Sequence, residues 1–294
     1  MKKIMTPRMM LITSMTIFGT LAPFVRNISV SSGELSLYRA VLAALLIGVF
    51  LLITKQKIPF KSLGRDLFLL LFSGIAMGFN WVFLFEAYKY TTASVATLSY
   101  YFAPVIVTVV CPILFREKLT PRQILCFVMS TLGIVMITGI GDLSGGGRNI
   151  IGILFSLGAA VLYATVVLIN KFIRNVDGIH RTFLQFLAVI LILVPYVAVT
   201  GGVTLGGMNG LGWGCLLIVG LFHTGVTYCM YFSSLNEVTG QEAAILSYLD
   251  PLVAVLISVT VLGEQMTFWQ IVGGVLILGF TLWNEIAPSE KSAA

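Results

Sequence analysis

Apolar residues follow one another in long runs along the whole chain, and ten of these runs hold about 20 residues each. A helix of that length crosses the roughly 30 Å hydrocarbon core of a bilayer. The ten predicted spans cover residues 9–28, 35–53, 67–88, 92–115, 121–140, 150–173, 182–199, 213–235, 240–262 and 267–284. No polar stretch between them is long enough to form a soluble domain. The pattern therefore predicts an all-α integral membrane protein with ten transmembrane helices.

Composition supports this class, because 58% of the residues are hydrophobic and only 10% are charged. A soluble domain carries about 25% charged residues. The basic start and apolar core of the first span resemble a signal peptide, but no small-residue cleavage site follows, so we expect an uncleaved helix. The four cysteines lie inside apolar spans without a CxxC pair, which favours buried free thiols over a metal or redox site. The sequence predicts no cofactor.

Lysine and arginine are distributed unevenly between the predicted loops. With the N-terminus inside, the inner segments hold 14 of them and the outer loops hold three, while Arg39 lies within the second span. The positive-inside rule then predicts a multi-pass protein of the cytoplasmic membrane with both termini in the cytoplasm. The net charge of +6 lies mostly beside anionic lipid and does not indicate nucleic-acid binding. The sequence gives no indication of the oligomeric state.

The chain contains an internal repeat. Residues 92–123 return as residues 239–270, at an offset of 147 residues, which is half of the chain, without a gap. The uncommon residues that recur are Tyr101 and Tyr248, Pro104 and Pro251, Glu117 and Glu264, and Gln123 and Gln270. The first copy ends in a loop with three cations, whereas the second copy has none there. In a membrane protein this difference predicts that the two loops lie on opposite sides.

Each half carries five predicted spans, and an odd number places the second half upside down in the membrane. We therefore predict two inverted five-helix repeats. The predicted units are a first repeat at 1–141, a glycine-rich linker at 142–149, an inverted second repeat at 150–286 and a cytoplasmic tail at 287–294. The linker lacks the GK[ST] ending of a phosphate-binding loop, so we do not expect nucleotide binding.

Two phrases carry a resemblance to a known family. SVATLSYYFAPVIVTVVCPILFREKLT at 94–120 and EAAILSYLDPLVAVLISVTVLGEQMT at 242–267 resemble the EamA-type ten-helix transporters of the drug/metabolite transporter superfamily. YRAVLAALLIGVFLL at 38–52 resembles the arginine-containing second helix of that family. The resemblance covers nearly the whole chain and is specific for the fold but not for the substrate. It implies a cavity formed by the first four helices of each half, with the fifth and tenth helices packed together at the periphery.

Inverted repeats suit a protein that opens alternately to either side of the membrane around a central site. We therefore predict a secondary active transporter that moves a small organic metabolite, such as an amino acid or a related compound. The family resemblance favours export, and coupling to protons is a hypothesis. The alternative is an exporter of hydrophobic organic cations or drugs. A distant alternative is an integral-membrane enzyme or receptor, which would need a catalytic cluster or polar domain that this sequence lacks.

Asp250 is the most informative candidate for substrate binding or coupling. It lies near the middle of the ninth span, and its repeat partner is Ala103, so the fold does not require a carboxylate there. It can bind a cationic substrate group, take up a proton, or form a structural hydrogen bond to a neighbouring helix. Pro104 and Pro251 each remove a backbone donor within a span and free carbonyls near residues 100 and 247. These matched kinks suit gating, and equally a shared scaffold.

Four further polar residues lie within predicted spans. Asn80 and Thr227 occupy matching repeat positions, which suggests either a shared cavity wall or hydrogen bonds between helices. His223 lies one turn before Thr227 and can titrate, but a lone histidine in an apolar helix is more often structural. Arg39 can extend its charge to the outer surface, and the family resemblance adds a possible gating role.

Aromatic residues gather on the same helices. The candidates placed deep enough to contact a substrate are Tyr101, Tyr248, Trp81, Tyr163 and Tyr228. Rings beside a carboxylate attract organic cations and also accommodate flat metabolites. The alternative is the aromatic belt that Trp and Tyr form at the membrane surface.

Overall fold

The computed structural model describes residues 5–56, 63–114, 119–138, 147–173, 175–176, 178–235, 237–238, 243 and 246–286. Most of the predicted linker at 142–149 and the tail at 287–294 lie outside these residues, as do Arg116, Glu117 and Lys118.

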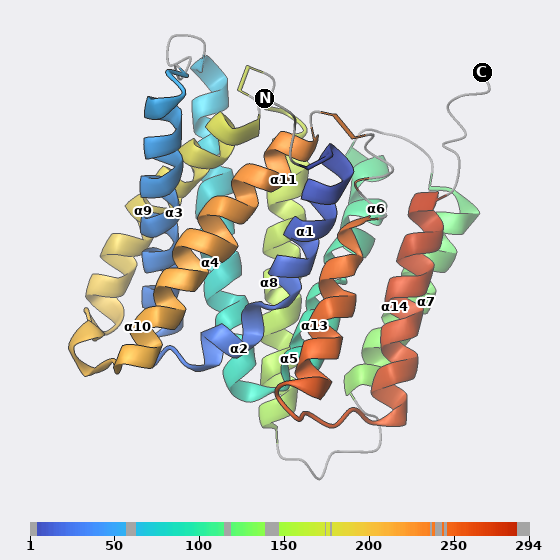
Figure 1. The fold of residues 1–294 in the computed structure, drawn as a ribbon. Coiled ribbons are helices and arrows are strands. Elements are labelled where there is room, and N and C mark those ends of the chain that lie inside the picture. Colours follow the sequence, from blue (N-terminus) through green and yellow to red (C-terminus); the bar gives the residue numbers. More distant parts are fainter. Residues whose placement is uncertain are drawn as a thin grey trace.

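Helices make up most of the described chain (Figure 1). In chain order they are α1 (Pro7–Gly19), α2 (Leu21–Arg26), α3 (Ser32–Ile53), α4 (Gly64–Tyr90), α5 (Ala93–Tyr100), α6 (Ala103–Leu114), α7 (Pro121–Thr138), α8 (Arg148–Asn170), α9 (Gly178–Thr200), η3 (Leu205–Gly207), α10 (Gly210–Leu217), the π-helix η4 (Ile218–Val226), α11 (Thr227–Leu235), α13 (Leu249–Thr260) and α14 (Phe268–Ile286).

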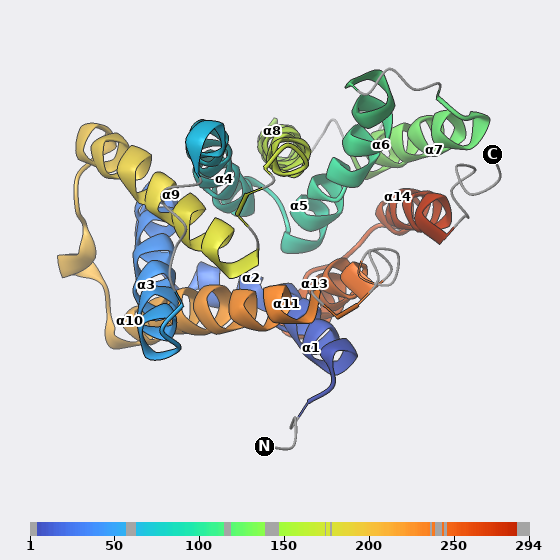
Figure 2. The ribbon, with the colours of Figure 1, turned by 90° about the horizontal axis from the view of Figure 1, so that it is seen from above.

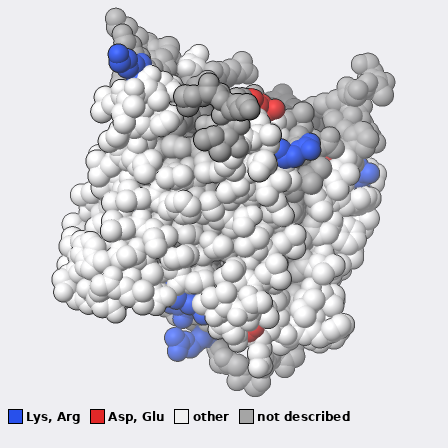
Figure 3. All heavy atoms as spheres, in the orientation of Figure 1, with Lys and Arg blue, Asp and Glu red and all other residues white. Residues whose placement is uncertain are grey.

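The predicted ten-span architecture is confirmed. Eight helical segments are long and apolar enough to cross a membrane, and two shorter apolar helices, Pro121–Ile137 and Leu249–Thr260, fall on the predicted fifth and ninth spans. On the face drawn in Figure 3, charged side chains lie near the two ends of the molecule and the surface between them is uncharged. This distribution is typical of a protein surrounded by lipid.

Seen from above, the helices form two layers (Figure 2). The α4 layer contains α4, α5 and α8, and the α1 layer contains α1, α3, α11 and α13. Helix α9 packs against both α3 and α4 at one end of the molecule, while α7 and α14 pack against each other at the other end. The α7–α14 pair is the peripheral pair that the family resemblance implies.

Glycines allow α7 and α14 to approach closely. A Cβ atom built on Gly133 would lie 2.7 Å from the carbonyl oxygen of Gly273, and one built on Gly273 would lie 2.5 Å from that of Gly133. Such contacts between small residues are a common means of helix association in membranes, where the hydrophobic effect does not drive helices together.

The predicted spans 9–28 and 92–115 each contain a break between two helices, the second of them beside the kink that Pro104 predicts. Thr20 separates α1 from α2, and a turn at residues 101–102 separates α5 from α6. In the second case Phe102 donates to the carbonyl of Ser99 at 3.2 Å, three residues back, and Pro104 has no N–H with which to restore the helical pattern. Tyr248, the repeat partner of Tyr101, occupies a turn immediately before α13.

Polar capping holds the first turn of α3. Ser31 and Glu34 form a reciprocal capping box, with 3.1 Å hydrogen bonds between each side chain and the other residue's amide. Glu34 also accepts hydrogen bonds from the amide and the hydroxyl of Thr204, at 2.6 and 2.7 Å. One buried carboxylate therefore ties α3 to the loop that follows α9.

Candidate functional site

A cavity of about 360 Å³ lies between the two layers. The α4 layer contributes Met77, Trp81, Leu84, Tyr88, Thr97, Tyr100, Tyr163, Val166, Val167 and Asn170, and the α1 layer contributes Met15, Phe18, Gly19, Arg39, Tyr228, Tyr231, Phe232, Asp250 and Ala254. The lining is mainly aromatic and aliphatic, with a few polar groups that converge on the same space. Such a wall is typical of a site for a small organic molecule.

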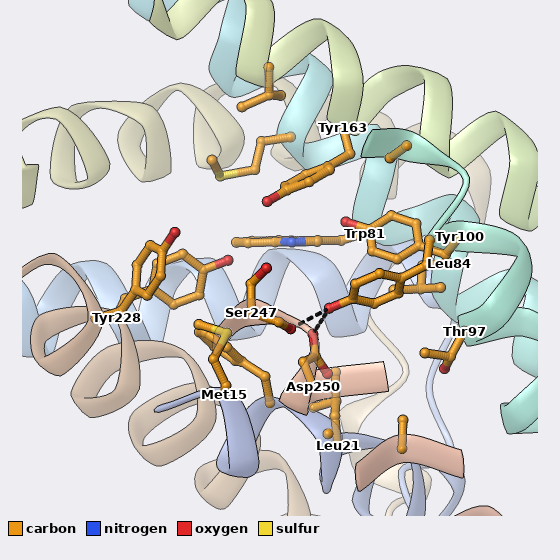
Figure 4. Close-up of a pocket in the computed structure, with 18 of the residues that line it drawn as sticks. Met15, Leu21, Trp81, Leu84, Thr97, Tyr100, Tyr163, Tyr228, Ser247 and Asp250 are labelled. Atoms are coloured by element: carbon orange, nitrogen blue, oxygen red, sulfur yellow. Dashed lines mark hydrogen bonds between the residues drawn. The ribbon is translucent and has the colours of Figure 1, made fainter. Parts of the chain in front are cut away.

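Asp250, labelled in Figure 4, and Tyr101 both line this cavity and form a hydrogen bond with each other. The Tyr101 hydroxyl donates to the Asp250 carboxylate at 2.6 Å and lies 3.5 Å from the carbonyl oxygen of Ser247. Tyr101 comes from the turn between α5 and α6, whereas Asp250 lies in the first turn of α13. The hydrogen bond therefore joins the two layers.

Gly19 fixes the distance between α1 and the backbone at Asp250. A Cβ atom on Gly19 would lie 2.6 Å from the Asp250 carbonyl oxygen and 2.6 Å from the Cβ atom of Val253. Only glycine fits at this contact without a shift of the helices. The packing of α1 thus determines where the carboxylate is placed.

Arg39 places a cation on the same cavity. Its side chain is 3% exposed, its Nε atom donates to the Thr224 hydroxyl at 3.1 Å, and its guanidinium lies 4.1 Å from the centre of the Trp81 ring and 5.2 Å from that of Phe85. The contact with Trp81 is a cation–π interaction. Within the described part of the chain, neither Arg39 nor Asp250 forms an ion pair. Among the described residues, the cavity lining therefore holds one acidic and one basic side chain that form no ion pair.

The predicted aromatic candidates divide into two groups. Tyr101, Trp81, Tyr163 and Tyr228 line the cavity. Tyr163 lies against Tyr100, with 5.6 Å between ring centres, and Tyr228 lies 5.2 Å from Phe18. Tyr248 is buried but does not line the cavity.

Asn80 forms hydrogen bonds within the α4 layer, and one of its partners, the Tyr100 side chain, lines the cavity. Its side-chain amide donates to the backbone carbonyl of Ala159 at 2.6 Å, which joins α4 to α8. Asn80 is 2% exposed and is not part of the cavity lining. The geometry matches the alternative of an interhelical hydrogen bond, and a contact with substrate stays a prediction.

His223 and Thr227 bond within the α1 layer and likewise lie outside the lining. The His223 ring is 3.0 Å from the Thr20 hydroxyl, and its other nitrogen is 3.4 Å from the carbonyl of Ile218. Thr227 donates to the carbonyl of Phe222 at 2.8 Å. Each carbonyl lies five residues before the side chain that contacts it, which is the hydrogen-bond spacing of a π-helix. These two side chains therefore contact backbone carbonyls of η4.

The two candidate prolines are placed differently. Pro104 lines the cavity, just after the turn that holds Tyr101, whereas Pro251 is buried and lies outside the lining. Pro251 nevertheless acts on the cavity through the backbone. It has no N–H to donate to the carbonyl of Ser247, four residues back, and this carbonyl is the one that lies near the Tyr101 hydroxyl.

Sequence reasoning missed two amides at one end of the cavity. The Gln185 side chain donates to the Ser73 hydroxyl at 2.6 Å and to the Asn170 side-chain oxygen at 2.8 Å, which connects α4, α8 and α9. Asn170 and Gln185 both line the cavity. The signal was present, since each is an uncharged polar residue within a predicted apolar span.

Glu264 connects the layers near the opposite end of the cavity. Its carboxylate accepts hydrogen bonds from the backbone amides of Ala93 at 2.9 Å and Ser94 at 3.4 Å, at the start of α5. It also pairs with Arg26 at the end of α2 and accepts a hydrogen bond from Ser258 of α13. A carboxylate at a helix N-terminus is electrostatically favourable.

The described residues contain no group of three or more His, Cys, Asp or Glu side chains that could hold a metal ion. Cys126, Cys215 and Cys229 are free thiols. The Cys111 side chain lies outside the described part of the structure.

Comparisons with known proteins agree with this geometry. The model of the EamA-like transporter family matches the chain twice, at residues 6–139 and 150–284. The "Uncharacterized transporter YxxF" of Bacillus subtilis (strain 168) is 31% identical over 268 residues, which cover 91% of this chain and 85% of that protein. An "Uncharacterized transporter" of Clostridium kluyveri is 27% identical over 84% of this chain and 82% of its own length. A solved structure described as "Crystal structure of protein" shares the fold, with a TM-score of 0.64 at 16% identity over 94% of this chain and 95% of its own.

Proposed function

The chain belongs to the EamA-like transporter family, and from this premise we propose that it is a secondary transporter of a small organic zwitterion, such as an amino acid or a related compound. The single observation that carries the substrate class is the pair of unpaired charges, Asp250 and Arg39, on one mainly aromatic cavity. An ammonium group would bind at Asp250 and a carboxylate at Arg39. The rings would surround the rest of the molecule.

The size and electrostatics of the cavity support this assignment. Its volume of about 360 Å³ falls at the small end of ligand sites and suits a molecule of amino-acid size. A buried guanidinium without a carboxylate partner is costly, and an anionic ligand group would offset that cost. A site for hydrophobic cations would need only Asp250 and the rings, so Arg39 is the residue that separates the two substrate classes.

The position of the cavity supports access from the cytoplasmic side. In the orientation predicted from Lys and Arg, α8 runs from the outer face at Arg148 to the inner face at Asn170, and its lining residues begin only at Tyr163. Glu264 and Arg26 then lie at the outer end, where they join the two layers. We propose an inward-facing state that takes its substrate from the cytoplasm for export.

Proton coupling is a further part of the proposal. Asp250 is a carboxylate within the membrane whose described hydrogen-bond partner is a neutral hydroxyl, and such groups serve as proton carriers in transporters. His223, the other titratable candidate, is bonded to Thr20 away from the cavity and does not support a coupling role.

The test is a thermal-stability screen of the purified protein with three related ligands. L-phenylalanine carries both charges, phenethylamine carries only the amine, and 3-phenylpropionate carries only the carboxylate. We expect the largest stabilisation from the zwitterion and a smaller one from each singly charged ligand, because a ligand that binds the folded state raises its stability by mass action. Zwitterions with a longer spacing between the charges, such as 5-aminopentanoate, are tested in the same screen. The response to them shows which distance between ammonium and carboxylate the site accepts.

Variants of Asp250 and Arg39 test which residue binds the ammonium group of the ligand and which binds its carboxylate. Asp250→Asn should abolish the response to the zwitterion, and Arg39→Gln should leave only a response to the amine. Ser130→Ala serves as the matched control, because Ser130 is buried on α7 outside the cavity lining and should leave ligand responses intact. A larger response to phenethylamine than to any zwitterion would favour the hydrophobic-cation alternative instead.

A further inference from the structure

The Tyr101 hydroxyl faces two acceptors that both belong to the opposite side of the cavity. The Asp250 carboxylate lies at 2.6 Å and the Ser247 carbonyl oxygen at 3.5 Å (Figure 4). A tyrosine hydroxyl has one proton to donate. Tyr101 can therefore give a full hydrogen bond to only one of these acceptors at a time, and in this structure the carboxylate receives it.

Both acceptors suit such an exchange. Among the residues that the structure describes, Tyr101 is the side chain that donates a hydrogen bond to Asp250. The Ser247 carbonyl receives no helical hydrogen bond from residue 251, which is proline, and a carbonyl oxygen has two lone pairs with which to accept. A rotation of the tyrosine side chain would exchange a short bond to the carboxylate for one to the carbonyl.

Among the described residues around Asp250, no cation forms an ion pair with the carboxylate that would compete with the Tyr101 hydrogen bond. The other titratable groups that interact electrostatically with Asp250 are Tyr88 of α4, Tyr100 of α5, Tyr163 of α8 and Tyr228 of α11. On the α1 side, Gly19 lies against the Asp250 backbone carbonyl and presents no titratable group.

The repeat shows that the arrangement is not a requirement of the fold. The partner of Tyr101 in the second half is Tyr248, and the partner of Asp250 in the first half is Ala103. Tyr248 therefore has no carboxylate at the symmetric position, and it lies buried outside the cavity lining. Of the two repeat-related positions, the pair Tyr101 and Asp250 forms a tyrosine–carboxylate hydrogen bond, and the pair Tyr248 and Ala103 has no carboxylate with which to form one.

We propose that Tyr101 is a positioning residue for Asp250, which holds the carboxylate while the site is empty and transfers its hydrogen bond to the Ser247 carbonyl when a ligand cation or a proton occupies Asp250. The part that concerns the ligand rests on the proposed transport function. One consequence is that Tyr101 competes with the ligand, so the hydroxyl weakens binding and speeds release. A second is that one hydrogen bond joins the layers in both the empty and the occupied states.

The first test measures the reactivity of Asp250 without any substrate. Dicyclohexylcarbodiimide modifies protonated carboxyl groups in apolar sites, and mass spectrometry of the peptide that contains Asp250 gives the rate. An O–H donor stabilises the carboxylate anion, so Tyr101→Phe should raise the rate about tenfold, the size of one hydrogen bond to a charged group. Tyr248→Phe is the matched control and should react at the parent rate. Asp250→Asn should show no modification at this position.

The second test separates positioning from a merely structural role. Phenethylamine supplies an ammonium group that should protect Asp250 from the carbodiimide. In Tyr101→Phe the amine should protect at a lower concentration than in the parent, because it no longer displaces a hydroxyl. A variant with a damaged fold would instead lose protection. Tyr101→Met, which also lacks the hydroxyl, is measured alongside so that poor recovery of one variant does not decide the result.

The outcomes are distinct from those of the transport assay. An unchanged or slower reaction of Asp250 in both Tyr101 variants would overturn the positioning role, whether or not the protein transports amino acids. A faster reaction together with an absence of transport would uphold the positioning role and reject the proposed function. Equal acceleration by Tyr248→Phe would overturn the proposal as well, because that change lies outside the cavity.

Discussion

At the scale of single residues, the hydrogen-bond partner of a polar side chain indicates whether that side chain joins neighbouring helices or belongs to the candidate site. Asn80 bonds within the α4 layer, and His223 bonds to Thr20 between α1 and α2, so each fastens neighbouring helices on its own side of the cavity. Tyr101 and Asp250 instead meet across the cavity, and Arg39 lines it without an ion pair to any described residue. The sequence places all five residues inside apolar spans but does not distinguish these two situations.

Gly19 offers a test of how α1 positions the site. A methyl group there would lie 2.6 Å from the Asp250 carbonyl oxygen, closer than backbone atoms tolerate. Gly19→Ala should therefore destabilise the protein by about 1–3 kcal/mol, as overpacking in a tight interior does, and should weaken ligand binding by displacing Asp250. Thermal unfolding in detergent and the ligand screen measure the two effects.

The matched control for this change is Gly279→Ala on α14. A Cβ atom on Gly279 meets no atom within 4 Å, so the substitution should leave stability unchanged or raise it slightly through helix propensity. Equal stability of the two variants would mean that the contact between α1 and α13 is looser than the structure indicates.

At the scale of helices, the apolar pattern predicted the spans well and their interruptions poorly. All ten predicted spans coincide with helices, because burial in lipid requires long apolar runs wherever a helix crosses. The apolar pattern does not mark the breaks at Thr20 and at residues 101–102, although Pro104 predicts a kink beside the second one. Apolar residues are equally common on both sides of a break, and what ends the helix is local hydrogen bonding and the missing N–H of proline.

The contact between Glu264 and the start of α5 is the helix-scale feature that we expect to move. In the proposed orientation it closes the outer end of the cavity, and an outward-facing state must break it. Glu264→Gln removes the charge from both the helix cap and the pair with Arg26. Charge-assisted hydrogen bonds of this kind contribute a few kcal/mol, so the outward-facing population should rise about tenfold or more.

A cysteine at Thr97 reports this change. Thr97 lines the cavity towards its outer end, and a membrane-impermeant thiol reagent added outside should label Thr97→Cys faster in the Glu264→Gln background. The four natural cysteines are first replaced. Glu86→Gln is the control, because Glu86 binds Ser32 and Lys89, both within the first half of the chain. Slower labelling in Glu264→Gln, or equal acceleration by Glu86→Gln, would argue against an outer gate at this position.

At the scale of the whole molecule, the two matches to one family model and the layered helices establish a multi-pass membrane transporter. The sequence supplied the class, the repeat and the residue Asp250. It did not supply the cavity, because which residues face it depends on how the two layers meet. Tyr248 and Thr227 looked as suitable as Tyr101 and Tyr228 from their depth along the chain, and only the packing of the layers puts them elsewhere.

In the proposed function, this cavity carries a zwitterion across the membrane. Counterflow measures it most directly: purified protein in liposomes preloaded with unlabelled L-phenylalanine takes up labelled L-phenylalanine from outside. We expect accumulation by the parent and by Ser130→Ala, and none by Asp250→Asn or Arg39→Gln, since each charge binds one end of the substrate. Accumulation that persists in Asp250→Asn, or counterflow of phenethylamine but of no zwitterion in the panel, would contradict this account.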